Sequence, residues 1–194
     1  MEIKYIVGAT PLEPEELSDL IPSHIQTQWQ LNEWESINVE SWLDWAQRGK
    51  KDIVTEMFCK TLHKKMFGKT WKWAGSFRRS DKNIGCPWIK IALELREVLD
   101  TTRFWIENKT FPIHEIAIRF HYRLVFVHSF PNGNGRFSRA MADILIARHK
   151  QTPLLWNTFW DIANMSDIHK KYIESLRKAD NGDFSDLIDL CSPK

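Results

Sequence analysis

The chain has 194 residues, of which 43% are hydrophobic, enough for one globular domain whose core needs neither disulfides nor a metal. Its 27 lysines and arginines nearly balance its 25 aspartates and glutamates, so charge alone argues against a protein that binds nucleic acid or a membrane surface. Three cysteines without a C-x-x-C spacing, an acidic beginning unlike a signal peptide and the lack of a membrane-length apolar run predict a reduced, cytoplasmic protein.

The first predicted elements are helices. A short one is expected near Pro14, where a proline and acidic residues form a first turn. Over 28–47, tryptophans and a valine recur near one face and predict a longer helix. Another is expected over about 52–66, where apolar residues keep helical spacing and Gly68 follows as a stop.

The segment 68–88 differs from its neighbours. It lacks helical periodicity and contains Gly75, Gly85 and Pro87. This composition predicts a loop, with a short β-hairpin across roughly 76–86 as the only β candidate in the chain.

The second half of the chain is again helical in pattern. Periodicity returns over 88–107 and is strongest over 112–127, which begins with a proline and has a 3.6-residue apolar repeat. Three further helices are expected over about 135–149, 166–178 and 184–190. The predicted fold class is therefore all-α, as a single helical domain.

A glycine-rich turn separates two of these helices, in the string HSFPNGNGRFSR at 128–139. One helix is expected to end at His128, and the next to start near Asn134 or Gly135. Glycines let backbone N–H groups approach a ligand, and a helix N-terminus presents unpaired N–H donors and the positive end of a dipole. The turn therefore predicts an anion site.

Charged side chains flank the turn. Arg136 and Arg139 are three residues apart on one helix face, which suits a di- or triphosphate. An imidazole at His128, titrating near neutral pH, is suited to general-base work beside that site. The plainer interpretation is a helix–helix turn with a capping asparagine and solvated arginines.

The complete string resembles the Fic motif, H-x-F-x-[D/E]-G-N-G-R-x-x-R, and departs from it at one fixed position. The resemblance implies a protein adenylyltransferase, which moves AMP from ATP onto a Ser, Thr or Tyr hydroxyl of a target protein. It assigns the role of general base to His128 and the anchoring of the loop to Phe130. It implies that the phosphates are bound by Gly133, Asn134, Gly135, Arg136 and Arg139.

The departure is Asn132, where the family usually has the acidic ligand of Mg²⁺ or Mn²⁺. An amide oxygen can coordinate such a hard cation, but a carboxylate is preferred. At 135, the family's phosphate-transferring branch has lysine, so Gly135 favours AMP transfer. Two alternatives stay open: a catalytically weak module that only binds nucleotide, and a toxin-like protein silenced by a separate regulatory partner.

The resemblance extends over roughly 50–190. The segment 61–78 is similar to the family sequence before its flap, a hairpin that holds the target by strand addition. The flap residues are expected to be Asn83, Ile84, Gly85 and Cys86. The segment 172–187 is similar to the family's closing segment, which implies adenine contact by Tyr172, with a buried core tyrosine as the alternative.

The beginning of the chain resembles the Fic subgroup called mobile mystery protein B. We expect 1–50 to form a helical extension and 51–194 to form the Fic domain. Many Fic proteins carry an inhibitory glutamate that pairs with the second motif arginine. The candidates in this chain are Glu33, Glu35 and Glu40, with a solvated acidic helix face as the alternative.

Overall fold

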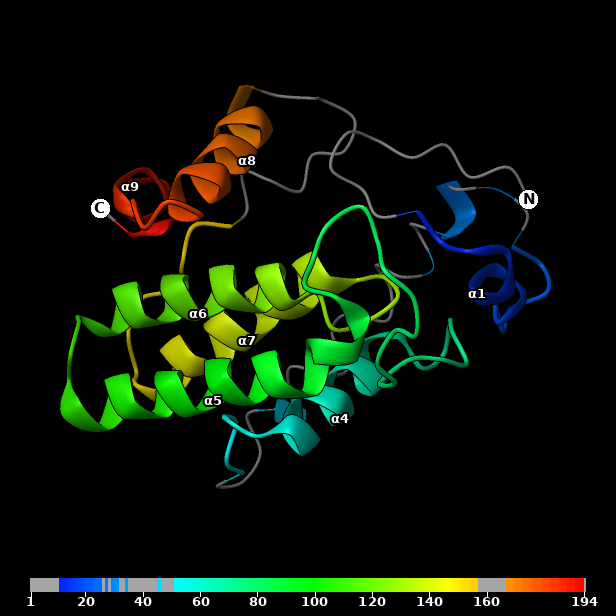
Figure 1. Ribbon diagram of the computed structural model, residues 1–194, viewed down its shortest axis with the longest axis horizontal. Helices are drawn as coiled ribbons and strands as arrows, with labels where there is room; N and C mark the ends of the chain where they lie inside the picture. Colours follow the sequence, from blue (N-terminus) through cyan, green and yellow to red (C-terminus); the bar gives the residue numbers. More distant parts are fainter. Residues whose placement is uncertain are drawn as a thin grey trace.

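The structure is a computed structural model that describes residues 11–25, 27, 29–31, 34, 45–46, 51–156 and 167–193. Within these ranges the regular elements are helices, joined by irregular segments and one isolated antiparallel bridge between Leu20 and Trp71 (Figure 1). The predicted all-α class is therefore confirmed. Most of the helix expected over 28–47 lies outside the described residues.

The first helix, α1, spans Pro14–Ser18 and is tied to the irregular segment that follows α4. The backbone N–H of Glu13 donates to the Glu16 carboxylate at 2.8 Å, which closes the first turn. The same carboxylate accepts from the ammonium of Lys82 at 2.6 Å, and the Glu16 carbonyl accepts from the Trp73 indole at 3.1 Å. Hydrogen bonds from Lys82 and Trp73 to Glu16 thus attach this short helix to the 68–88 segment.

Helix α4 spans Glu56–Phe67 and begins four residues later than its apolar pattern suggests. The preceding residues form a capping turn, in which Asp52 Oδ1 accepts from the Val54 N–H at 3.0 Å and Thr55 Oγ1 accepts from the Phe58 N–H at 3.1 Å. One face of α4 is buried, and this face includes a histidine, His63, among its apolar residues.

Helix α6, Ile113–Val127, is the centre of the fold. It begins one residue after Pro112 and ends at His128, which adopts the left-handed conformation with φ 51°. Helix α5, Ile91–Asn108, preceded by the 3-10 turn η1 at Trp88–Lys90, packs on one side of it, and α7, Asn134–Arg148, packs on another (Figure 1). The expected boundaries of α6 and α7 are correct within one residue.

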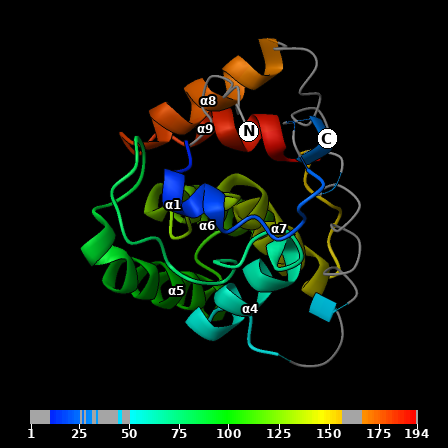
Figure 2. The same cartoon turned by 90° about the vertical axis from the view of Figure 1, so that its right-hand side faces the viewer.

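The last two helices, α8 at Asp167–Ala179 and α9 at Ser185–Cys191, pack on each other. Figures 1 and 2 show α6 and α7 between this pair on one side and α4 with α5 on the other. A backbone bond from the Leu155 N–H to the Cys191 carbonyl, at 2.9 Å, joins α9 to the segment after α7. Among the described helices, none is both long and apolar enough to cross a membrane.

Candidate active site

The motif occupies the turn between α6 and α7. Both ends of this turn are left-handed: His128 caps α6 with φ 51°, and Gly133 caps α7 with φ 78°. The chain therefore leaves one buried helix and enters the next within a few residues. The imidazole at one end and the first N–H groups of α7 at the other belong to the same compact turn, as the sequence predicts.

A buried arginine, Arg78, holds the irregular 68–88 segment to this turn. Its backbone N–H donates to the Ser129 carbonyl at 3.0 Å, and its Nε donates to the His128 carbonyl at 2.7 Å. Its other guanidinium nitrogens donate to the carbonyls of Ser80, at 2.8 Å, and Cys86. One side chain thus fixes the backbone at Ser80, at Cys86 and at the candidate base.

Of the predicted flap residues, Gly85 lies beside His128, but the segment forms no hairpin. The structure describes all of 76–86, and no part of this segment forms a strand. The physical reason is that carbonyls that a hairpin would pair with cross-strand N–H groups are bonded to the Arg78 guanidinium. Gly85 has φ 104°, and a Cβ at this position would lie 2.6 Å from His128 Cβ. Only glycine permits so close an approach.

His128 lies in a largely enclosed environment, with 5% of its surface exposed. Burial, with the positive charges of Arg78 and Lys82, lowers the pKa of the imidazole to about 4. The ring is therefore neutral at physiological pH and able to accept a proton.

His63, which the motif analysis does not single out, supports the turn from α4. Its Nδ1 accepts from the Gly75 N–H at 3.0 Å, so its Nε2 carries the proton and donates to the Asn132 carbonyl at 3.1 Å. The ring also stacks on Phe130, with centroids 3.7 Å apart. The only sequence signal for this role is a histidine among the apolar residues of one helix face.

The interior of the turn is organised by Phe130 and Asn134. Phe130 is fully buried and packs edge-on against Phe137 at a centroid distance of 5.1 Å. The Asn134 amide accepts from the Phe130 N–H at 2.9 Å and donates to the Phe130 carbonyl at 2.8 Å. The asparagine side chain therefore shapes the turn, which leaves its backbone N–H as its means of contacting an anion.

Both motif arginines lie at the N-terminal end of α7. The Arg136 guanidinium lies over the Phe67 ring, 4.6 Å from its centroid. The Arg139 guanidinium folds back over Gly135, where a Cβ would lie 3.9 and 4.0 Å from its two terminal nitrogens. Two cations beside a helix N-terminus suit a polyphosphate.

The motif lies within a region that matches a known protein family. Residues 52–146 match the model of the Fic/DOC family. The chain contains a Fic/DOC family domain. That match includes the candidate base, the turn and both arginines.

The curated relatives are named as adenylyltransferases. This chain is 27% identical over 144 residues to "Protein adenylyltransferase Fic" of Aedes aegypti, covering 72% of this chain and 27% of the relative. A protein of the same name from Nematostella vectensis is 30% identical over 99 residues, covering 49% of this chain and 21% of the relative. The chain thus spans only about a quarter of the length of the curated relatives it matches.

Solved structures share the fold at low identity. The N-terminal Fic domain of a putative cell filamentation protein from Bartonella quintana has a TM-score of 0.68 and 15% identity, covering 90% of each chain. A Bartonella tribocorum effector protein with bound AMPPNP has a TM-score of 0.64 and 17% identity, covering 94% of this chain and all of that one. C. elegans Fic-1 has a TM-score of 0.63 and 20% identity, covering 89% and 50%.

Tyr172 lies in the core of the folded protein, with 4% of its surface exposed. Its hydroxyl lies 2.8 Å from His121 Nε2 on α6 and is also hydrogen-bonded to Arg139. This is the environment expected of a core tyrosine with a satisfied hydroxyl. Adenine contact by Tyr172 stays a prediction.

Asn132 offers a metal ion in the Fic domain a single neutral ligand. Its Oδ1 already accepts from the Gly133 N–H at 2.7 Å. In the part of the chain that the structure describes, no group of three or more His, Cys, Asp or Glu side chains could hold a metal ion. The residues that the structure describes therefore fit Mg²⁺ or Mn²⁺ poorly. The three candidate inhibitory glutamates lie outside the described residues.

Alanine at Gly133 and at Gly135 should have opposite effects on folding. At Gly133, φ is 78° and a Cβ would lie 2.7 Å from two ring carbons of Phe67, so we expect a loss of about 3 kcal/mol. At Gly135 a Cβ meets only ordinary contacts inside a helix, so we expect a gain of up to about 1 kcal/mol. Urea denaturation of both variants tests this; equal losses would contradict it.

Acid should destabilise the folded domain because its buried histidines stay neutral. Burial is the main cause that lowers the pKa of His63 and His121 to about 3 and that of His128 to about 4. Below pH ~6.5 the unfolded chain protonates all three histidines, whereas the folded chain does not. Burial raises the pKa of Asp143 to about 6, so below this pH the folded chain carries a proton on Asp143 that the unfolded chain lacks. This proton offsets the uptake by one of the three histidines.

The net uptake on unfolding is therefore about two protons, and stability should fall by about 2.7 kcal/mol per pH unit between roughly pH 6 and pH 4. Above about pH 6.5 this contribution is complete. Urea denaturation at a series of pH values measures the slope. A stability that does not change between about pH 6 and pH 5 would show that the buried histidines are already charged in the folded state.

Proposed function

We propose that this protein transfers AMP from ATP to a Ser, Thr or Tyr hydroxyl of a target protein, with His128 as the general base. The observation that carries the proposal is the composition of one short turn. A buried, neutral imidazole lies at its start, and the N-terminus of α7 with Arg136 and Arg139 follows at its end. A base next to an anion site suits attack of a hydroxyl on phosphorus. The names of the curated relatives support the same reaction.

In the proposed reaction, the target hydroxyl gives its proton to the His128 imidazole as its oxygen attacks the α-phosphorus. A new oxygen–phosphorus bond forms, and the bond between the α-phosphorus and the bridging oxygen of the β-phosphate breaks. Pyrophosphate leaves with its charge stabilised by Arg136 and by the first N–H groups of α7. The chain's main contributions are positioning and charge stabilisation.

The low pKa of His128 fits a base that works only when ATP is bound. Burial, together with the charges of Arg78 and Lys82, disfavours the protonated imidazole in the free protein. A triphosphate bound beside the ring adds negative charge, which raises the pKa of the imidazole toward neutrality. Arrival of the nucleotide would thus strengthen the base.

We propose that the target segment docks along Asn83 to Cys86. This segment is held against His128 by Arg78 and by the contact at Gly85, so a chain lying on it passes close to the imidazole. Addition of an extended target segment would use backbone hydrogen bonds and need no particular target sequence.

We also propose that the Fic domain runs from 51 to 194, with 1–50 as an extension. The hydrogen bond between His121 of α6 and Tyr172 of α8 supports inclusion of the last two helices. So does the backbone bond from Leu155 to Cys191 of α9.

Mass spectrometry of a cell lysate tests the proposed reaction. The lysate is incubated with ATP and either the wild-type protein or its His128→Ala variant. We expect at least one lysate protein to gain a single AMP group on a hydroxyl side chain in the first sample only. Gain of a phosphate group in place of AMP would show a different transfer reaction.

A second candidate function is nucleotide binding without turnover, and Asn132 favours it. The metal-ligand position of the family motif is neutral in this chain, so the ion that accompanies ATP would be held weakly. Tight ATP binding without detectable transfer, under conditions in which an Asn132→Asp variant transfers AMP, would identify this function.

Asn132→Asp should lower the Mg²⁺ concentration needed for half-maximal transfer by about tenfold, because a carboxylate binds this ion better than an amide. The new side chain keeps an oxygen that can accept from the Gly133 N–H. Asn181→Asp, which adds the same charge at an exposed turn, is the control. Equal Mg²⁺ dependence in both variants would show that position 132 does not contact the ion.

A further inference from the structure

A buried chain of polar side chains crosses three helices behind the candidate phosphate site. Arg139 comes from α7, Tyr172 from α8 and His121 from α6. The Tyr172 hydroxyl lies 2.8 Å from His121 Nε2 and is hydrogen-bonded to the Arg139 guanidinium. Polar groups this deeply buried fix one another's positions, because an unpaired partner would be costly.

The direction of each hydrogen bond follows from the chemistry of the groups. A guanidinium can only donate, so the Tyr172 oxygen accepts from Arg139. The tyrosine O–H is then free to donate to His121 Nε2. Burial keeps His121 neutral, with a pKa of about 3, so its Nε2 can accept. The hydrogen bonds therefore run from Arg139 through Tyr172 to His121.

The guanidinium at the head of this chain lies at the candidate phosphate site. Its terminal nitrogens lie 3.9 and 4.0 Å from a Cβ position at Gly135, in the first turn of α7. One turn further along α7, the Asp143 carboxylate accepts from the Trp156 indole at 2.6 Å. Trp156 in turn packs on His121, with ring centroids 4.7 Å apart. Trp156 thus connects the Asp143 carboxylate to the ring of His121.

We propose that Tyr172 and His121 are positioning residues, which hold the Arg139 guanidinium at the first turn of α7 for the terminal phosphate of ATP. The inference rests on the proposed function. It places Tyr172 at the phosphate end of the nucleotide and not at the adenine. Because Tyr172 belongs to α8, it also makes the docking of α8 a condition for tight ATP binding.

Calorimetric titration with ATP, ADP and AMP distinguishes these roles, in a His128→Ala background that prevents turnover. Tyr172→Phe removes only the hydroxyl. We expect its affinity for ATP to fall on the order of tenfold, the loss associated with a hydrogen bond to a charged group, and its affinity for AMP to stay the same. The same substitution in an Arg139→Ala background should have no further effect on ATP binding.

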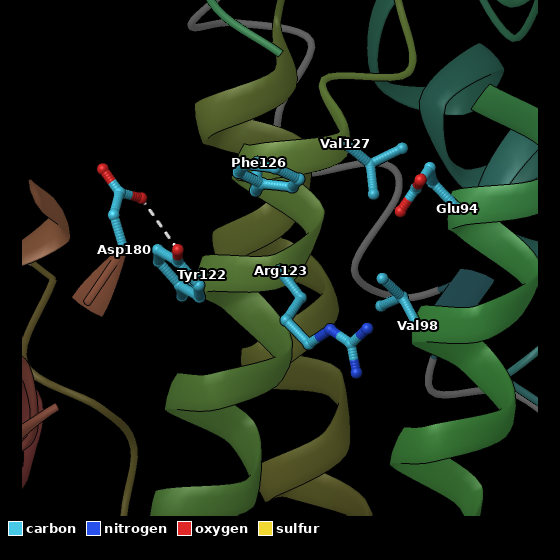
Figure 3. A pocket seen from close by; sticks show the side chains of 7 residues that line it. All are labelled: Glu94, Val98, Tyr122, Arg123, Phe126, Val127 and Asp180. Atoms are coloured by element: carbon cyan, nitrogen blue, oxygen red, sulfur yellow. Dashed lines mark hydrogen bonds between the residues drawn. The ribbon is translucent and has the colours of Figure 1, made fainter. Parts of the chain in front are cut away.

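Tyr122→Phe is the matched control. The Tyr122 hydroxyl donates to Asp180 at 2.8 Å and so also links α6 to the end of α8. Both residues line a pocket of about 240 Å³, whose lining also includes Glu94 and Val98 of α5 (Figure 3). This hydrogen bond does not involve the motif arginines, so ATP affinity should not change. An equal loss in both tyrosine variants would show a general loosening of α8 and overturn the inference.

Two other outcomes would also overturn it. Equal losses for ATP, ADP and AMP would assign Tyr172 to the adenine, and no loss for any nucleotide would make it a packing residue only. If the wild-type protein binds no adenine nucleotide, the proposed function itself fails. Nitrogen-15 NMR of the arginine side chains then tests the positioning separately: Arg139 should show slow guanidinium rotation that Tyr172→Phe abolishes, and equal rotation would overturn it.

Discussion

His128→Ala should reduce AMP transfer on the order of 10³-fold while leaving ATP affinity nearly unchanged. The imidazole accepts the hydroxyl proton in the proposed reaction, and loss of a positioned base typically has an effect of this size. The phosphates are expected to contact α7 and its arginines, which the substitution does not touch. Single-turnover transfer from labelled ATP and calorimetric titration measure the two quantities.

His149→Ala is the control for this variant. His149 is exposed at the far end of α7, so its removal should change neither transfer nor binding. Loss of transfer, ATP binding and thermal stability together in the His128 variant would make that residue structural. Its backbone carbonyl accepts a hydrogen bond from the Arg78 guanidinium, so such a role is physically reasonable.

Arg78→Met should destabilise the folded protein by on the order of 3 kcal/mol and remove transfer activity. The substitution keeps a long buried side chain but leaves the carbonyls of Ser80, Cys86 and His128 without their donor. The flap segment would lose its attachment to the candidate base. Urea denaturation and the transfer assay report the two losses.

Arg79→Met is the matched control, since Arg79 is the exposed neighbour of Arg78. We expect it to change stability by less than about 0.5 kcal/mol, as for most surface substitutions. Equal destabilisation by the two variants would contradict a stabilising role for the hydrogen bonds that the Arg78 side chain makes.

The helical framework could be predicted because its signals are local. Pro112 at the start of α6, the apolar repeat that follows and the glycine-rich turn each act within a few residues of the boundary that they set. The helix boundaries in the second half of the chain consequently agree closely with expectation. The start of α4 was placed too early because its capping turn continues the apolar pattern.

The absence of the hairpin could not have been predicted from sequence, because a tertiary contact of Arg78 competes with the hairpin. Glycines and a proline at 75–87 are equally compatible with a hairpin and with an irregular loop. The outcome depends on where the Arg78 guanidinium lies, and its partner His128 is 50 residues away in the chain. Sequence spacing carries no information about such a contact.

The sequence likewise predicted only part of the candidate site. The motif string correctly placed His128 and the arginines at the two ends of one turn. It could not show that the Asn134 side chain is used within the turn, nor that His63 supports it from α4. The surroundings of Tyr172 depend on His121, a residue 51 positions earlier, so its burial became visible only in the structure.

The most direct test of the proposed activity compares ATP labelled with ³²P at the α-phosphate and at the γ-phosphate. Each is incubated with the wild-type protein or His128→Ala, in the presence of Mg²⁺ and a cell lysate. We predict that the label gained with the wild type over the His128→Ala sample comes from the α-phosphate only. A gain from the γ-phosphate, or no gain from either label despite measurable ATP binding, would contradict AMP transfer by this protein.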